Sequence, residues 1–369
     1  MSKSPDKKFR VLVVDDSAFM CRVLQEIITS DPQLEVVGQA RDGSDAVAMA
    51  DSLQPDVITM DINMPRVDGL QATEMIMSRH PRPIVIVSSE SREGAASTLR
   101  ALELGAIDFV PKPSTGIDLD MKSVRDDLTR KLKLAAKVRV VRTATLSKVP
   151  AAPVPSAHTA SRAPLPASQG GSKPPMVVIA ASTGGPAAVM RVVSGLPKDL
   201  VAAVFLVLHM PPAFTKQFVS QLAEVSALPV KEAEHNDAPQ PGTIYLCPGS
   251  HHLRISSTGN ISLDPGPRID GYRPCADVAF ETLASYARAL AVGVVLTGMG
   301  SDASKGVKAM KAAGGYVIAQ DEATSMIFGM PSEAIKTGAV DQVLPLDEIP
   351  AAIEKRVAKL NRLVLVGAR

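Results

Sequence analysis

Two groups of polar residues stand directly after apolar runs, and the first group is acidic. Asp15 and Asp16 follow the apolar run 11–14, and Asp61 follows the run 57–60. The carboxyl ends of parallel strands meet at one edge of a sheet, so we expect the three carboxylates to share a pocket. A hard divalent cation such as Mg²⁺ prefers oxygen ligands and would relieve their mutual repulsion.

A lysine and a serine follow two further apolar runs and would reach the same pocket. Lys112 lies just beyond one run, and Ser88 ends the other. A carboxylate can act as a nucleophile and form an acyl phosphate, while a metal ion and an ammonium group neutralise the transferred phosphoryl group. The joint placement of these residues favours phosphoryl transfer. Taken singly, Asp15 or Asp16 could instead cap the next helix, and Lys112 could be solvated.

The second group consists of Ser182, His209 and Asp302, each at or shortly after the end of another apolar run. Ser182 precedes the segment 183–186, Thr-Gly-Gly-Pro, whose glycines permit a tight turn from a strand into a helix. Backbone N–H groups at that helix N-terminus would favour a developing oxyanion. In this arrangement Ser182 attacks a carbonyl carbon, His209 takes its proton, and Asp302 orients the imidazole.

The residues of this second group leave other interpretations open. The chain order Ser…His…Asp differs from the orders of chymotrypsin, subtilisin and the α/β-hydrolases, and the G-x-S-x-G motif is absent. Ser182 or Asp302 could cap a helix, and Ser-Thr-Gly-Gly could hold a phosphate. His209 could be structural. Spacing alone therefore does not decide between a triad and these alternatives.

The elements that must position both groups alternate between strands and helices. Short and almost continuously apolar runs are typical of strands buried on both faces, and helical periodicity separates them. This pattern predicts a doubly wound, five-stranded parallel sheet in the first part of the chain and a second α/β domain with a mostly parallel sheet. The first set of strands is expected at 11–14, 34–40, 57–60, 84–87 and 107–110. In the second domain, 244–246 and 253–255 are expected to form a pair of shorter strands among antiparallel or irregular additions.

A segment rich in proline, alanine, serine and glycine separates the two series. Residues 149–175 show no hydrophobic period. Such a segment cannot bury enough apolar surface to offset the entropy of ordering it, so we interpret it as a semi-extended linker.

Composition limits the function further. The chain has 369 residues, a net charge of +2, 3% aromatic residues and no tryptophan, which argues against a dedicated nucleic-acid-binding protein. Its three cysteines, Cys21, Cys247 and Cys275, form no C-x-x-C motif and fit a reducing compartment. The N-terminal segment lacks the apolar stretch of a signal peptide, and no apolar run is long enough for a membrane span. A cytoplasmic protein is expected.

The pattern VDDS…MDINMPxxDG…VSS…PKP resembles the receiver domain of two-component response regulators over residues 9–127. This resemblance implies that Asp61 is the phosphoacceptor. It assigns a Mg²⁺ site to Asp15, Asp16, Asp61 and the backbone carbonyl of Asn63. It further implies that Ser88 and Lys112 contact the phosphoryl group and that Phe109 occupies the aromatic switch position.

Residues 174–362 resemble the catalytic domain of the chemotaxis protein-glutamate methylesterase (CheB) family, with residues 128–173 as linker. The matching segments are IAASTGGP at 179–186, HMPPAFT at 209–215, YLCPGSHHL at 245–253, RPCADVAF at 273–280, LTGMGSDAS…G at 296–306 and QDEATSMIFGMP at 320–331. The resemblance implies that Ser182, His209 and Asp302 are the catalytic triad. It places the backbone of Met299 in the oxyanion hole and Thr183 in an assisting position.

The implied reaction is hydrolysis of glutamyl methyl esters on chemoreceptors with release of methanol, together with deamidation of selected glutamines. A sensor histidine kinase would supply the phosphoryl group, and the unphosphorylated receiver would block the hydrolase cleft. Mg²⁺ would serve receiver phosphorylation only, and the hydrolase would need no cofactor. The resemblance also implies a monomer that is not inserted in the membrane and binds no nucleic acid.

Two rival functions share parts of this pattern. A response regulator that acts only by binding would have the same receiver. A DNA-binding output is disfavoured because no compact basic helix-turn-helix segment follows residue 130. A pure scaffold would not need the set of Ser182, His209 and Asp302. An esterase for small molecules would share the triad and would need an apolar acyl pocket.

Overall fold

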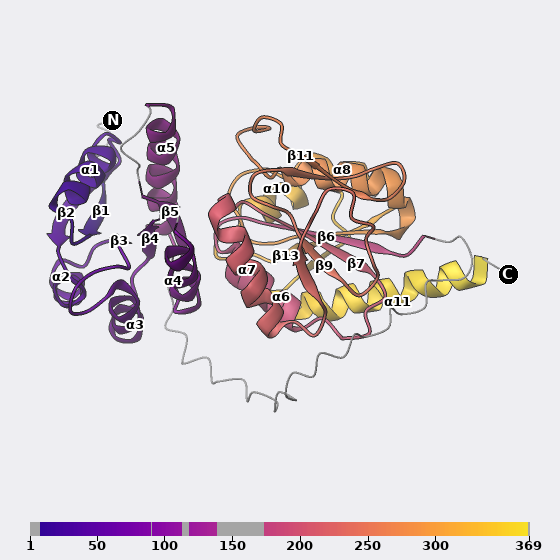
Figure 1. Cartoon of the computed structure of the whole chain (residues 1–369), viewed down its shortest axis with the longest axis horizontal. Coiled ribbons are helices and arrows are strands. Elements are labelled where there is room, and N and C mark those ends of the chain that lie inside the picture. The colour runs from indigo at the N-terminus through magenta and orange to yellow at the C-terminus, as the bar shows by residue number, and fades with distance from the viewer. Residues whose placement is uncertain (1–7, 90, 113–117, 139–172, 368–369) are drawn as a thin grey trace, which may run out of the picture.

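The structure is a computed structural model that describes residues 8–89, 91–112, 118–138 and 173–367. Figure 1 shows two α/β units, the first in indigo to purple and the second in magenta to yellow. Both confirm the predicted fold class. Within the described residues, no helix combines the length and the apolar character that crossing a membrane requires.

The first unit is a five-stranded parallel sheet of order β2-β1-β3-β4-β5. Every residue of β3 and β4 is buried, as expected for central strands covered by helices on both faces. Its strands are β1 (Phe9–Val14), β2 (Leu34–Ala40), β3 (Val57–Met60), β4 (Ile84–Ser88) and β5 (Asp108–Pro111). Its helices are α1 (Ala18–Thr29), α2 (Gly43–Leu53), α3 (Gly69–Arg79), α4 (Arg92–Glu103) and α5 (Asp118–Ala135).

The second unit is built on a seven-stranded parallel sheet of order β14-β13-β12-β6-β7-β9-β8. Its strands are β6 (Met176–Ala181), β7 (Ala203–Leu208), β8 (Val230–Glu232), β9 (Ile244–Leu246), β12 (Ala291–Val295), β13 (Tyr316–Gln320) and β14 (Gln342–Leu344). Its helices are α6 (Gly185–Ser194), α7 (Pro212–Val225), α8 (Ala276–Ala287), α9 (Ser304–Ala312), α10 (Met330–Lys336) and α11 (Ile349–Gly367). The adjacent strands β12, β6 and β7 lie at its centre.

Both of the shorter strands expected in the middle of the second unit are present. Residues 244–246 form β9, which joins the main sheet beside β7 and does not pair with 253–255. The latter residues belong to β10 (His252–Ile255), whose antiparallel partner is β11 (Ile261–Asp264). All three residues of β9 are buried, so this strand is stabilised best inside the sheet.

The expected limit of the receiver at residue 127 falls inside α5. The helix continues to Ala135 because Leu128, Leu132 and Ala135 are buried in the core of the first unit. Charged residues on its other face also make contacts: Arg130 approaches the second unit, and Lys131 approaches the start of β5.

The two units are in direct contact. Helix α4 packs against α6 and α7, and one continuous cluster of buried apolar side chains includes residues of both units. The rings of Phe109, in β5, and Phe214, in α7, lie 4.4 Å apart between centroids. Figure 1 accordingly shows α4 and α5 on the side of the first unit that faces α7.

Candidate active site

Ser182 lies at the carboxyl end of β6, in the centre of the larger sheet. Its backbone N–H donates to Thr297 O at 3.0 Å, and its carbonyl accepts from Gly185 N at 2.7 Å, which closes the turn into α6. Gly184 has φ +73°, and a Cβ there would come within 2.8 Å of the Met326 side chain. This turn therefore needs glycine, and it places Ser182 at the N-terminus of α6 as the sequence predicts.

His209 and Asp302 are brought together from different strands. His209 Nε2 lies 2.8 Å from Asp302 Oδ2. His209 directly follows β7, and Asp302 ends the loop after β12, so the adjacency of β6, β7 and β12 explains the gathering of all three predicted residues at one edge.

Asp302 is almost completely buried and is held by backbone donors. Its carboxylate accepts from Ala276 N at 2.6 Å, Asp277 N at 2.9 Å and Ala303 N at 2.9 Å. Burial raises the pKa of Asp302, but the hydrogen bond and charge of His209, with these N–H donors, outweigh burial and lower the pKa to about 2. The carboxylate is therefore ionised at neutral pH and fixed in orientation.

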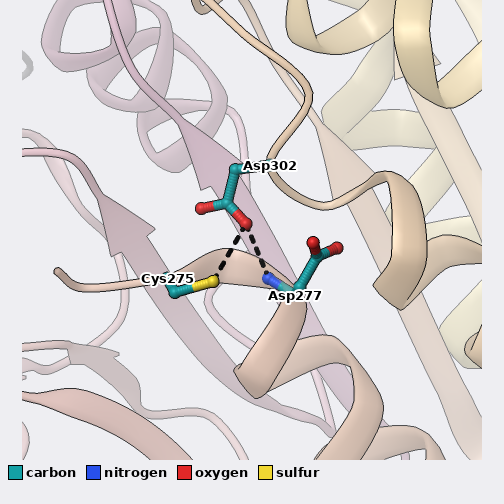
Figure 2. Close-up of side chains that lie close together, drawn as sticks. All are labelled: Cys275, Asp277 and Asp302. Atoms are coloured by element: carbon teal, nitrogen blue, oxygen red, sulfur yellow. Dashed lines mark hydrogen bonds between the residues drawn. The ribbon is translucent and has the colours of Figure 1, made fainter. Parts of the chain in front are cut away.

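Figure 2 shows two neighbours of this carboxylate, Cys275 and Asp277, at the start of α8. The Cys275 Sγ donates to Asp302 Oδ1 at 3.3 Å, and the same oxygen accepts from Asp277 N. Burial, and then the nearby Asp302, raise the pKa of Cys275 to about 12, so the thiol stays protonated.

Cys275, Asp277 and Asp302 also have ligand-type atoms within 4.8 Å of one another. These residues do not fit a resident metal ion. The Asp302 oxygens already accept hydrogen bonds from backbone N–H groups, and the thiol is a donor. The side chain of Asp277 accepts a hydrogen bond from Gly306 N at 2.7 Å.

The two nitrogens of His209 have different surroundings. Because the Asp302 carboxylate only accepts, Nε2 carries the proton of that hydrogen bond. Nδ1 is buried and has no hydrogen-bond partner among the described residues, so it is the nitrogen free to act as a base. The Ser182 hydroxyl likewise makes no hydrogen bond within the described part of the chain.

The loop from Thr297 to Gly300 lies against Ser182. A Cβ on Gly298 would come within 2.8 Å of Ser182 Cβ. Thr297 Oγ1 donates to Thr183 O at 3.0 Å and accepts from Ile327 N at 2.9 Å, which joins three segments of the site. Met299, which is half-buried, directly follows Gly298 in this loop.

The Thr183 side chain hydrogen-bonds to the first unit and not to a residue of the candidate triad. Its buried Oγ1 donates to Asp108 Oδ2 at 2.6 Å, in β5 of the first unit. Arg130, also in the first unit, places Nη1 at 3.3 Å from Met299 Sδ. The first unit thus touches both residues that were expected to assist the triad.

The acidic pocket of the first unit brings its expected members together. Asp15, Asp16 and Asp61 have carboxylate oxygens within 4.8 Å of one another, and Lys112 Nζ lies 2.8 Å from both Asp15 Oδ2 and Asp61 Oδ2. Ser88, at the end of β4, is buried beside this group. Exposed Asn63 follows Asp61 in the loop after β3.

The electrostatics of this pocket suit a cation. Burial raises the pKa of Asp61, and Lys112 offsets this only in part. Burial lowers the pKa of Lys112, but its two carboxylate partners outweigh burial and raise it, so the ammonium stays charged. The pocket offers three carboxylates as oxygen ligands, and one of them, Asp16, is exposed. This set of ligands fits Mg²⁺.

Comparison with known proteins identifies both units. Residues 11–123 match the response regulator receiver domain, and residues 177–353 match the CheB methylesterase family. A protein-glutamate methylesterase/protein-glutamine glutaminase of Pyrococcus horikoshii is 46% identical, covering 95% of this chain and 94% of that protein. The chain belongs to the CheB methylesterase family.

A second relative covers almost the whole chain, and a solved structure covers half of it. The corresponding protein of Symbiobacterium thermophilum is 44% identical over 97% of this chain and 100% of its own length. The crystal structure of the Thermotoga maritima CheB methylesterase catalytic domain is 38% identical and covers 50% of this chain and 99% of that chain, with a TM-score of 0.48.

Sequence reasoning missed three contributors to the site. Asp108 reaches Thr183, Tyr272 stacks on the His209 ring, and the start of α8 holds Asp302. The segment RPCADVAF was noted at 273–280, but nothing in its composition shows that its backbone N–H groups point at Asp302.

Proposed function

We propose that this chain is a phosphorylation-regulated protein-glutamate methylesterase and protein-glutamine glutaminase that acts on chemoreceptors, with Ser182, His209 and Asp302 as its catalytic triad. The observation that carries the proposal is the 2.8 Å contact of His209 Nε2 with Asp302 Oδ2, beside Ser182 at the end of β6. The names of its relatives support the substrate class.

In the proposed mechanism Ser182 Oγ attacks the carbonyl carbon of a glutamyl methyl ester or a glutamine side chain. His209 Nδ1 takes the hydroxyl proton and delivers it to the leaving methanol or ammonia. A water molecule, deprotonated by the same nitrogen, then hydrolyses the acyl-enzyme. Asp302 stabilises the imidazolium, and the backbone of Met299 with the N-terminus of α6 stabilises the oxyanion.

In the receiver we propose Asp61 as the phosphoacceptor and a histidine kinase as the phosphodonor. Asp15, Asp16, Asp61 and the carbonyl of Asn63 would hold Mg²⁺, which when bound neutralises charge on the phosphoryl group. Lys112 and Ser88 contact the transferred group. Phe109 connects this pocket to α7, against which its ring packs.

The contacts between the two units support an inhibitory receiver. Asp108 accepts a hydrogen bond from the hydroxyl of Thr183, the residue after the proposed nucleophile. Arg130 contacts Met299. Phosphorylation of Asp61 would change the packing of Phe109 and weaken these contacts, which would open the site to a receptor. A catalytic unit at 174–362, a linker that begins beyond the end of α5, a monomeric state and action in the cytoplasm complete the proposal.

The test is product release from receptor cytoplasmic fragments. Methyl-esterified fragments are expected to yield methanol and glutamine-containing fragments ammonia. Both products should vanish with Ser182→Ala and persist with Ser194→Ala, which alters a serine at the exposed end of α6. Methanol release at the wild-type rate by Ser182→Ala would remove this serine from the mechanism.

A further inference from the structure

An aromatic ring covers one face of the candidate base. The rings of Tyr272 and His209 are stacked, with 4.4 Å between centroids and 17° between planes. Tyr272 is half-buried and comes from the loop between β11 and α8. None of the proposed catalytic steps uses it.

The loop that carries Tyr272 is held closed by a buried histidine. His252 Nδ1 accepts from Cys275 N at 3.1 Å, so its Nε2 carries the proton and donates to Pro267 O at 3.0 Å. One imidazole thus joins the two ends of the segment 267–275. His252 is 1% exposed and begins β10, where it pairs with Asp264 of β11.

Further bonds fix Tyr272 within that loop. Ile269 and Tyr272 exchange backbone hydrogen bonds, at 3.0 Å and 2.9 Å, across a turn that contains Gly271 at φ +88°. Arg273 Nη1 donates to Gly266 O at 3.0 Å. The ring of Tyr272 is therefore placed by an ordered backbone instead of by a free loop.

The hydroxyl end of Tyr272 lies against the loop that supplies Asp302. A Cβ on Gly300 would come within 2.1 Å of Tyr272 Oη, so only glycine leaves room for this ring. The same 267–275 segment leads into Cys275, Ala276 and Asp277, which hold the Asp302 carboxylate. The loop 267–275 and the start of α8 that follows it therefore contact both the face of the His209 ring and its carboxylate partner.

These contacts define what Tyr272 can do to the imidazole. A ring stacked on one face prevents rotation of the His209 ring out of the plane in which Nε2 meets Asp302. Nδ1, on the edge of the ring, has no hydrogen-bond partner among the described residues. An aromatic face also stabilises the positive charge that the imidazole acquires during attack.

We propose that Tyr272 is a positioning residue that holds the His209 imidazole in its catalytic orientation by stacking on it, a role that rests on the proposed triad. The ring and not the hydroxyl carries this role. Tyr272→Phe should therefore retain it, and Tyr272→Leu, which keeps an apolar side chain but no flat aromatic face, should lose it.

The test uses the full-length chain with Mg²⁺ and a small-molecule phosphodonor, and a fluorophosphonate that labels the active-site serine. This reaction needs the triad but not a receptor, so it separates the role of Tyr272 from the identity of the substrate. The maximal labelling rate and the half-saturating probe concentration are measured separately for the wild type, Tyr272→Phe and Tyr272→Leu, with Ser182→Ala as the blank. Thermal unfolding establishes that the variants are folded.

We expect Tyr272→Phe to label within about twofold of the wild type and Tyr272→Leu to lose about tenfold in maximal rate, at an unchanged half-saturating concentration. Equal rates for Tyr272→Leu and the wild type, or an equal loss in both variants, would overturn the proposal. A wild type that labels but releases no methanol would contradict the proposed substrate and leave the Tyr272 comparison valid. A wild type that does not label at Ser182 would refute the triad and the role of Tyr272 together.

Discussion

Thr183 and Asp108 form a hydrogen bond of 2.6 Å that joins the two units of the chain in a buried position. Thr183 follows the candidate nucleophile Ser182, and Asp108 precedes Phe109, whose ring packs on Phe214. A single contact thus connects the backbone beside the nucleophile with the residue expected to respond to phosphorylation. Asp108 also forms an ion pair with Lys131 at 3.2 Å.

Breaking this bond should release the hydrolase without phosphorylation. A buried hydrogen bond to a charged group contributes about 1.5–3 kcal/mol, so Asp108→Ala should raise methanol release in the absence of a phosphodonor by about tenfold or more. The matched control is Asp126→Ala, which removes an exposed carboxylate of α5. Unchanged basal release by Asp108→Ala would show that the contact does not restrain the site.

Phosphorylation should act through Asp61 alone. In Asp61→Asn the ratio of methanol release with and without phosphodonor should fall to about 1, because the amide cannot form an acyl phosphate. Asp45→Asn, at an exposed position of α2, should keep the stimulation. Chelation of Mg²⁺ should abolish stimulation of the wild type. Stimulation that survives in Asp61→Asn would place the acceptor elsewhere.

Asp277 should make the stability of the catalytic unit depend on pH. Burial, and then the neighbouring Asp302, raise the pKa of Asp277 to about 6, although Gly306 N opposes this. A raised carboxyl pKa gives stability that is present below the unfolded value of about 3.9 and lost as pH rises through 6. Asp277→Asn should therefore raise the melting temperature by about 2–4 °C at pH 7.5 and leave it unchanged near pH 4. A gain of equal size at both pH values would contradict this origin.

Much of the fold follows from the sequence because the central strands carry a strong signal. β3, β4, β6 and β7 are buried at every residue, and short, continuous apolar runs are typical of strands covered on both faces. The strands that the sequence did not predict, β8, β11 and β14, are short and contain at most one buried residue each. Short strands of this kind look like loops in composition.

Some features of the candidate site could also be predicted from the sequence, and others could not. Ser182, His209 and Asp302 could be predicted because each stands beyond a buried strand. The stacking of Tyr272 on His209 could not be predicted. It depends on a loop whose two ends are joined by His252, a residue distant in the sequence. The Thr183–Asp108 bond joins two separate sheets, and no local pattern records such a contact.

The cysteines should be unreactive in the native chain. Cys21, Cys247 and Cys275 are all buried, and burial raises the pKa of each thiol. An aromatic disulfide reagent should titrate no thiol in the folded protein and all three in guanidinium chloride. Rapid native reaction of one cysteine, assigned by its serine variant, would show that its local structure opens.

We expect one chain to couple phosphorylation of Asp61 to hydrolysis by Ser182. The most direct test of this coupling is methanol release from methyl-esterified receptor cytoplasmic fragments, with and without phosphodonor and Mg²⁺, for the wild type and Ser182→Ala. Release that rises with the phosphodonor in the wild type and is absent in Ser182→Ala under both conditions is the predicted result. No release from any cognate receptor while Asp61 becomes phosphorylated would rule out this coupling and favour a receiver with a purely binding output.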